Sequence, residues 1–180
     1  MSPVLAMAAA VGVLLMFAGT ASASLPWVNG CDSALPGHTR TSATCGATLV
    51  DGRAVAPAFA PAAVKAAITA ANRIDGRPYV WGGGHARWAT RGYDCSGAVG
   101  YALHGAGQLE TTMVSGQMEF WGLAGVGRWI TIYANFDHVY MVIAGLRFDT
   151  RDDPPGVTGP RWHTEPVSPR GFVARHPAGY

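Results

Sequence analysis

The stretch that decides the fold reads RPYVWGGG at residues 77–84 and continues as GYDCSG at residues 92–97. It places Cys95 after a glycine-rich turn and before an apolar run that is typical of a helix. A thiol at a helix N-terminus lies beside unpaired backbone N–H groups and the positive end of the helix dipole. Because this setting favours the reactive thiolate over an inert buried thiol, the pattern indicates that Cys95 is a nucleophile.

A cysteine nucleophile needs a base close to its sulfur and a third group that orients the base. His138 is the predicted base, because it opens an apolar strand that would hold the imidazole rigidly. Asp149 is the predicted orienting group. A hairpin turn at 144–145 would place Asp149 diagonally across from His138 on one sheet face, whereas Asp137 would point to the opposite face.

The remaining histidines are less suitable bases. His85 is close to Cys95 in sequence, but it belongs to a glycine loop that we expect to be flexible. The others lie in a cysteine-flanked segment, at the end of the nucleophile's own helix, or in the C-terminal tail: His38, His104, His163 and His176.

Residues beside the nucleophile have supporting roles. A hydroxyl at Tyr79 would help the Cys95 N–H to stabilise an oxyanion, unless Tyr79 and Trp81 simply pack under the loop. Asp94 is expected to cap the helix and Ser96 flanks the sulfur. The glycine loop lacks the Gly-Lys-Ser/Thr of a phosphate-binding loop, and the cysteines are widely spread, so we expect no cofactor and no metal.

Periodicity predicts an α+β domain with an antiparallel sheet. Helical spacing covers 62–74, the nucleophile run covers 95–104, and a short helix is expected near 115–121. The later part of the chain has strand character, and the Pro/Gly/Arg-rich tail beyond Arg151 is expected to wrap the surface. The expected strands span 129–134, 138–143 and 146–150.

The N-terminal part indicates export. Residues 1–23 have the length and the Ala-Ser-Ala ending of a signal peptide, although no basic residue precedes the apolar run. Cys31 and Cys45 are expected to form a disulfide in an oxidising compartment, which leaves Cys95 unpaired. We interpret residues 24–60 as an irregular segment that leads into the domain.

Composition excludes other classes of protein. The formal net charge is only +2, and Lys65 is the one lysine among 13 basic residues, without a basic run. Nucleic-acid binding therefore has little support. Apart from the leader, no stretch is apolar enough to span a membrane, so we expect no stable membrane partner once the leader is removed, and a monomer.

Three motifs together resemble the NlpC-type family of papain-like cell-wall cysteine peptidases. They are YVWGG at 79–83, YDCSG at 93–97 and HVYMVI at 138–143, and the resemblance covers roughly residues 62–150. It implies a papain-like α+β core in which a nucleophile-bearing helix packs on an antiparallel sheet. By resemblance, the family's oxyanion tyrosine corresponds to Tyr79.

The resemblance implies a bacterial, secreted or wall-associated peptidase domain at 61–180 that cleaves peptidoglycan stem peptides through Cys95, His138 and Asp149. Three features depart from the family: Gly127-Arg128-Trp129 replaces a Gly-Asp step, the third catalytic position is often histidine rather than aspartate, and a C-terminal extension begins near residue 151. These put specificity in question more than the nucleophile. Open alternatives are an amidase or acyltransferase on the same scaffold, and a non-catalytic wall-binding protein.

Overall fold

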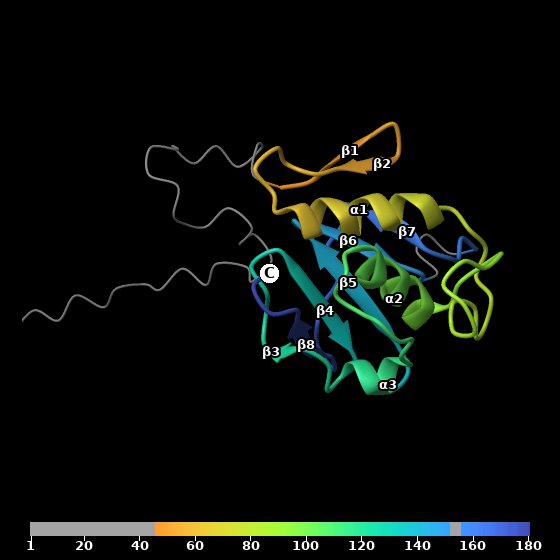
Figure 1. Ribbon diagram of the computed structural model, residues 1–180. Helices are drawn as coiled ribbons and strands as arrows, with labels where there is room; N and C mark the ends of the chain where they lie inside the picture. Colours follow the sequence, from red (N-terminus) through yellow and green to blue (C-terminus); the bar gives the residue numbers. More distant parts are fainter. Residues whose placement is uncertain (1–45, 152–155) are drawn as a thin grey trace, which may run out of the picture.

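The computed structural model describes residues 46–151 and 156–180 (Figure 1). The predicted leader at 1–23 and the predicted Cys31–Cys45 disulfide lie outside these residues. Within the described residues, no helix is both long and apolar enough to cross a membrane. The helices are α1 (Ala62–Ile74), α2 (Cys95–Gly105) and α3 (Ser115–Met118), close to the helices expected from the sequence.

Helix α1 forms because its apolar residues recur at helical spacing. Val64, Ile68 and Ala71 are buried along one face. The helix follows Pro61, whose fixed φ suits a helix start, and Asp75 ends it. This face packs against α2, where a side chain on Gly105 would overlap Ala70. The absence of a side chain at Gly105 thus lets the two helices approach closely.

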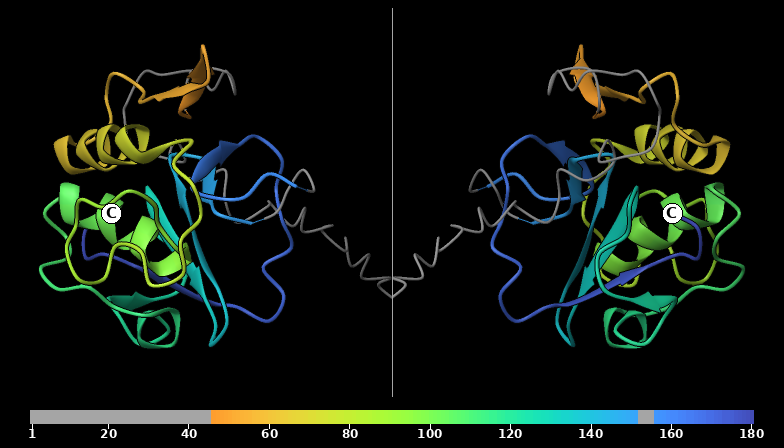
Figure 2. Two further views of the ribbon diagram at one scale, coloured as in Figure 1. Left: turned by 90° about the vertical axis from the view of Figure 1, so that its right-hand side faces the viewer. Right: turned by 90° about the vertical axis from the view of Figure 1, so that its left-hand side faces the viewer.

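One antiparallel sheet of six strands lies beneath these helices. Figure 2 shows α1 and α2 on one face of the sheet, which is the predicted α+β arrangement. In spatial order the strands are β3 (Leu123–Ala124), β8 (Val173–His176), β4 (Ile130–Ala134), β5 (Val139–Ile143), β6 (Leu146–Asp149) and β7 (Arg161–His163).

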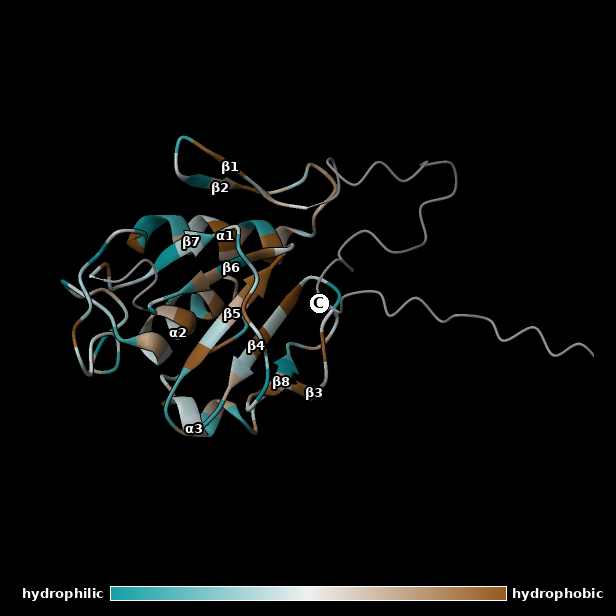
Figure 3. Cartoon of the chain, turned by 180° about the vertical axis from the view of Figure 1, so that it is seen from behind, coloured by the Kyte–Doolittle hydropathy of each residue, from teal (hydrophilic) through white to brown (hydrophobic). Residues whose placement is uncertain are grey.

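The two faces of the sheet bury different side chains. Val139, Met141 and Ile143 of β5 enter the main core beneath the helices. Tyr140 and Val142 alternate with them and join a smaller cluster on the opposite face. Most of β5 has apolar colouring in Figure 3, and all five of its residues are buried, so the strand is covered on both sides.

The predicted turn between β5 and β6 is confirmed. Ala144 and Gly145 both have positive φ, at 48° and 88°, as a two-residue type I′ hairpin requires. Ile143 pairs with Leu146 across this turn, and Met141 pairs with Phe148. This register fixes which residues of the two strands share a face.

The interpretation of 24–60 as irregular is wrong for the part that the structure describes. Strands β1 (Thr48–Val50) and β2 (Arg53–Val55) form a hairpin around Asp51-Gly52, whose φ values are 49° and 77°. Asn72 of α1 holds β2, because its side chain donates to the Ala54 carbonyl at 2.8 Å and accepts from the Ala54 N–H at 3.0 Å. The domain therefore begins before residue 61.

The expectation that the tail only wraps the surface is also wrong. β7 pairs with β6, and β8 lies between β3 and β4, next to the edge of the sheet. Both strands have only three or four residues, and β8 includes Arg175 and His176. Their strand structure depends on ladder hydrogen bonds to distant segments rather than on a local apolar pattern.

Candidate active site

Cys95 is the first residue of α2, as predicted. The preceding Asp94 has an extended backbone, and its carboxylate accepts a hydrogen bond from Gly97 N at 2.7 Å, which makes it the N-cap. Cys95 is a free, buried cysteine with 8% of its surface exposed. Its thiol therefore lies at the positive end of the helix dipole, where a thiolate is stabilised.

The predicted contact between His138 and Asp149 is present. Asp149 Oδ1 lies 2.8 Å from His138 Nε2, and it also accepts from the backbone N–H groups of Thr150 and Arg151 at 2.7 and 3.1 Å. With Met141 opposite Phe148, the register sets Asp149 diagonally across from His138. The side chain of Asp149 is completely buried, so its carboxylate depends on these partners.

A buried arginine approaches the other oxygen of this carboxylate. Arg147 lies two residues before Asp149, on the same face of β6, and its guanidinium is 3.6 Å from Asp149 Oδ2. Burial alone would raise the pKa of Asp149, but the hydrogen bond and charge of His138, followed by the charge of Arg147, hold it below its usual value. Asp149 is thus kept as a carboxylate.

The imidazole of His138 is held in the charged form. Burial opposes the charge, but hydrogen bonds to Asp149 and to Cys95 outweigh it and raise the pKa of His138 to about 9. Because Asp149 engages Nε2, Nδ1 is the ring nitrogen left to face the sulfur. The arrangement can hold a proton next to the Cys95 sulfur.

The backbone around His138 is also fixed. Asn135 accepts from His138 N through its side chain at 2.8 Å, and Asn135 N donates to the His138 carbonyl at 2.9 Å. The ring of Phe172 lies edge-on to the imidazole at 6.3 Å. Asp137 contributes its backbone N–H to Asn135 and is exposed. These contacts leave Asp149 as the carboxylate that orients His138.

Tyr79 lies at the start of the glycine loop and within electrostatic range of the sulfur. Burial, and then the charges of Cys95 and Asp94, raise the pKa of Tyr79, so the phenol stays protonated and can donate a hydrogen bond. A single parallel β-bridge between Tyr79 and Tyr93 holds this part of the loop in place. Trp81 does not pack under the loop, because 86% of its surface is exposed.

The three glycines allow close backbone packing. Gly82 and Gly84 have φ values of 74° and 93°, and a Cβ on Gly84 would lie 2.7 Å from Gly97 Cα. A Cβ on Gly97 would in turn overlap the Gly83 carbonyl oxygen. The loop therefore rests directly on the first turn of α2.

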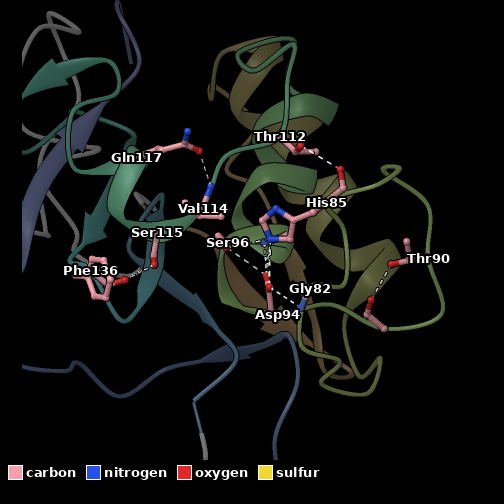
Figure 4. Close-up of polar contacts among 12 residues, drawn as sticks. Gly82, His85, Thr90, Asp94, Ser96, Thr112, Val114, Ser115, Gln117 and Phe136 are labelled. Atoms are coloured by element: carbon pink, nitrogen blue, oxygen red, sulfur yellow. Dashed lines mark hydrogen bonds and ion pairs between the residues drawn. The ribbon is translucent and has the colours of Figure 1, made fainter.

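His85, which the sequence places in a glycine loop expected to be flexible, makes several polar contacts in the structure. Figure 4 shows its imidazole pointing at Asp94 and Ser96. Its Nε2 lies 3.0 and 3.1 Å from the two Asp94 oxygens and 3.2 Å from Ser96 Oγ. The available signal was the presence of a carboxylate and a hydroxyl on both sides of Cys95, which need partners when they are buried.

The other described histidines lie elsewhere. His104 stacks on Trp88 with ring centroids 4.1 Å apart, and His163 and His176 belong to the late strands β7 and β8. Among residues 46–151 and 156–180, no group of three or more His, Cys, Asp or Glu side chains is arranged to hold a metal ion.

Comparison with known proteins gives matches among solved structures. No family model and no curated protein matches the sequence. The peptidoglycan hydrolase RipB from Mycobacterium tuberculosis is 26% identical, with a TM-score of 0.51, and the match covers 66% of each chain.

Two further matches carry the NlpC/P60 name. An NlpC/P60 family protein from Bacillus cereus is 23% identical over 64% of this chain and 40% of that chain, with a TM-score of 0.48. RipD from Mycobacterium tuberculosis, described as a non-catalytic NlpC/p60 domain protein adapted to peptidoglycan binding, is 22% identical over 65% of this chain and 98% of that chain, with a TM-score of 0.49.

Proposed function

Because the chain has the papain-like α+β fold of the NlpC/P60 proteins, we propose that it is a cysteine hydrolase that cleaves amide bonds in peptidoglycan stem peptides. The observation that carries the proposal is the contact of His138 with both Cys95 and Asp149. The substrate class is taken from the likeness to RipB, a peptidoglycan hydrolase. The proposal includes a bacterial, extracytoplasmic location.

In the first half of the proposed reaction, the thiolate of Cys95 attacks the amide carbonyl and forms a carbon–sulfur bond. The negative charge that develops on the carbonyl oxygen is stabilised by the Cys95 N–H and the Tyr79 hydroxyl. The protonated His138, held by Asp149, then gives its proton to the leaving amine as the carbon–nitrogen bond breaks. A thioester on Cys95 remains.

In the second half, the neutral imidazole of His138 takes a proton from water. The resulting hydroxide attacks the thioester carbonyl, and the carbon–sulfur bond breaks to release a carboxylic acid. The sulfur leaves as a thiolate next to the protonated imidazole. A raised pKa of His138 suits this cycle, because the imidazole then carries the proton that the leaving amine takes up.

Digestion of purified peptidoglycan tests the proposal. The full chain and the Cys95→Ala variant are incubated with the polymer, and the released fragments are identified by mass spectrometry. We expect fragments from the unaltered chain only, and their masses identify the bond that is cleaved. Alkylation of Cys95 by iodoacetamide is measured in parallel, with the Cys95→Ala variant as the blank.

Two other results would point to other functions. Transfer of the acyl group to an added amine instead of water would indicate an acyltransferase on the same scaffold. No fragments, together with an unreactive Cys95 and retention of the chain on the polymer, would indicate a non-catalytic peptidoglycan-binding protein. Either result would contradict hydrolysis as the function.

A further inference from the structure

A second polar cluster surrounds Asp94 at the start of α2 (Figure 4). Its carboxylate accepts hydrogen bonds from Gly97 N at 2.7 Å, Gly82 N at 3.0 Å and Ser96 Oγ at 3.2 Å, and His85 Nε2 lies 3.0 Å away. Asp94 is only 7% exposed, so these donors replace water around the carboxylate. The cluster is therefore a built and nearly closed arrangement.

The partners of Asp94 come from two separate segments. Gly97 and Ser96 belong to α2, whereas Gly82 and His85 belong to the glycine loop. A backbone hydrogen bond from Asp94 N to the Gly83 carbonyl, 3.2 Å long, joins the same segments. Since the glycines have no side chains to pack, the loop is held on the helix by these polar contacts.

His85 is itself fixed from outside the loop. Thr112 Oγ1 donates to the His85 carbonyl at 3.0 Å, so its backbone is anchored to the segment before α3. At the other end of the loop, Val80 N donates to the Tyr93 carbonyl at 3.2 Å and Tyr93 N donates to the Pro78 carbonyl at 3.1 Å. The loop is thus pinned at Tyr79 by backbone bonds and at His85 by side chains.

This cluster is not a second serine–histidine–aspartate centre. In such a relay the two ring nitrogens divide the work, one facing the hydroxyl and the other the carboxylate. Here one nitrogen, His85 Nε2, faces both Ser96 and Asp94, and the Ser96 hydroxyl donates to Asp94. The hydroxyl is therefore a donor in the cluster and is not activated for attack.

We propose that His85 is a positioning residue: it locks the glycine loop onto the first turn of α2 and so holds the Tyr79 hydroxyl at the oxyanion position beside Cys95. The inference rests on the proposed hydrolysis. Tyr79 pairs through an isolated β-bridge with Tyr93, which directly precedes Asp94, so its backbone lies beside the start of α2. If the Tyr79 hydroxyl is displaced, it no longer stabilises the oxyanion in the transition state, although the thiol of Cys95 remains intact.

The test compares His85→Ala, His85→Gln and the control His176→Gln, a half-buried histidine of β8. We expect His85→Ala to lower kcat on a peptidoglycan fragment by about tenfold to a hundredfold, with KM little changed. Alkylation of Cys95, which needs no oxyanion donor, should keep its rate. Because glutamine can donate to Asp94, His85→Gln should recover most of kcat, and the control should match the unaltered chain.

A double-mutant cycle with Tyr79→Phe tests the route of the effect. If His85 acts through Tyr79, adding His85→Ala to Tyr79→Phe lowers kcat no further. If the losses of kcat from the two substitutions multiply in the double variant, or if the alkylation rate falls together with kcat, the inference is overturned.

Amide hydrogen exchange separates this inference from the proposed function. In His85→Ala we expect the Gly82 N–H, which donates to Asp94, to exchange about tenfold faster, while the Gly97 N–H stays protected. If His85→Ala shows this faster exchange but the unaltered chain does not hydrolyse peptidoglycan, the proposed hydrolysis is overturned while the role of His85 in holding the loop is kept. If the exchange of Gly82 N–H is unchanged in His85→Ala while the unaltered chain is active, only the role of His85 in holding the loop is overturned.

Discussion

Two histidine–carboxylate pairs flank Cys95, and they use their atoms differently. His138 gives Nε2 to Asp149 and retains a second nitrogen for the sulfur, whereas His85 turns the same nitrogen to both Asp94 and Ser96. In the proposed mechanism the first pair transfers protons, and in our inference the second holds a loop. The two histidines thus differ in role although they are the same residue type, because the role depends on which ring nitrogens are available to other groups.

The carboxylates differ in the same way. Asp149 has a buried cation, Arg147, beside it, which stabilises its charge inside the sheet. Asp94 is satisfied mainly by backbone N–H groups of Gly82 and Gly97, which join two segments. The first environment favours an ion pair with an imidazolium, and the second favours a fixed backbone.

The largest expected effect is on kcat/KM, measured by making the same histidine-to-asparagine substitution in each histidine–carboxylate pair. His138→Asn should lower kcat/KM by about 10² to 10⁴, because it removes both the proton acceptor for Cys95 and the donor to the leaving amine. His85→Asn should lower it much less, since it removes only a positioning contact. Steady-state assays on one peptidoglycan fragment measure both, and a larger loss for His85→Asn would reverse the assignment.

Removing Arg147 is expected to be the largest effect on folding. Arg147→Met leaves the Asp149 carboxylate buried without its arginine, which should cost about 3–5 kcal/mol in the free energy of unfolding. Arg147→Lys keeps a cation and should cost less. Urea unfolding followed by circular dichroism measures both. Equal stability of Arg147→Met and the unaltered chain would mean that His138 and the backbone suffice for Asp149.

The pH dependence of stability should show the raised pKa of His138. A histidine whose pKa rises from 6.5 to about 9 on folding stabilises the fold below pH 6.5, by on the order of 3 kcal/mol, and loses this contribution as the pH rises through about 9. The lowered pKa of Asp149 has the opposite sign, so its contribution disappears in acid.

Comparing unfolding curves of the unaltered chain and His138→Asn between pH 6 and pH 10 isolates the contribution of His138 to the free energy of unfolding. Their difference should shrink between pH 6.5 and about 9, and hydrolysis should fall as the pH passes about 9 while alkylation of Cys95 does not. A difference that stays constant between pH 6.5 and pH 9 would contradict a charged His138 in the folded protein.

Local signals in the sequence were sufficient for much of this site. The helical spacing in 62–74, the cap before Cys95 and the turn at 144–145 each depend on neighbouring residues, and the structure has all three. The diagonal contact of His138 with Asp149 followed from that turn alone, because hairpin register is set by turn geometry. The catalytic roles of these residues remain predictions.

The parts that were missed have two causes. The hairpin at 48–55 has a local turn signal, Asp51-Gly52, between the short strands Thr48–Val50 and Arg53–Val55. Strands β7 and β8, by contrast, gain their hydrogen bonds from β6 and β4, and such long-range pairing leaves little local pattern. The role of His85 also depends on a contact across the loop, which the sequence spacing alone does not define.

The smallest expected effect distinguishes capping from charge at Asp94. Asp94→Asn should cost about 1 kcal/mol in the free energy of unfolding, because asparagine caps Gly97 N as well as aspartate does but presents one acceptor fewer to Gly82 N and His85. Asp137→Asn is the matched control. Its carboxylate is exposed beside His138, and the change should stay within about 0.5 kcal/mol.

Thermal unfolding and kcat, measured on both variants, complete the comparison. If Asp94→Asn loses as much turnover as a change in the His138–Asp149 pair while remaining folded, the Asp94 charge takes part in the chemistry, and the division between a proton-transfer pair and a loop-holding pair fails. If Asp94→Asn loses stability at the expected size and turnover only to the extent of His85→Ala, the two residues act as one lock. The second outcome is expected because, within the described residues, the polar contacts of the Asp94 side chain are with the glycine loop and with the first turn of α2.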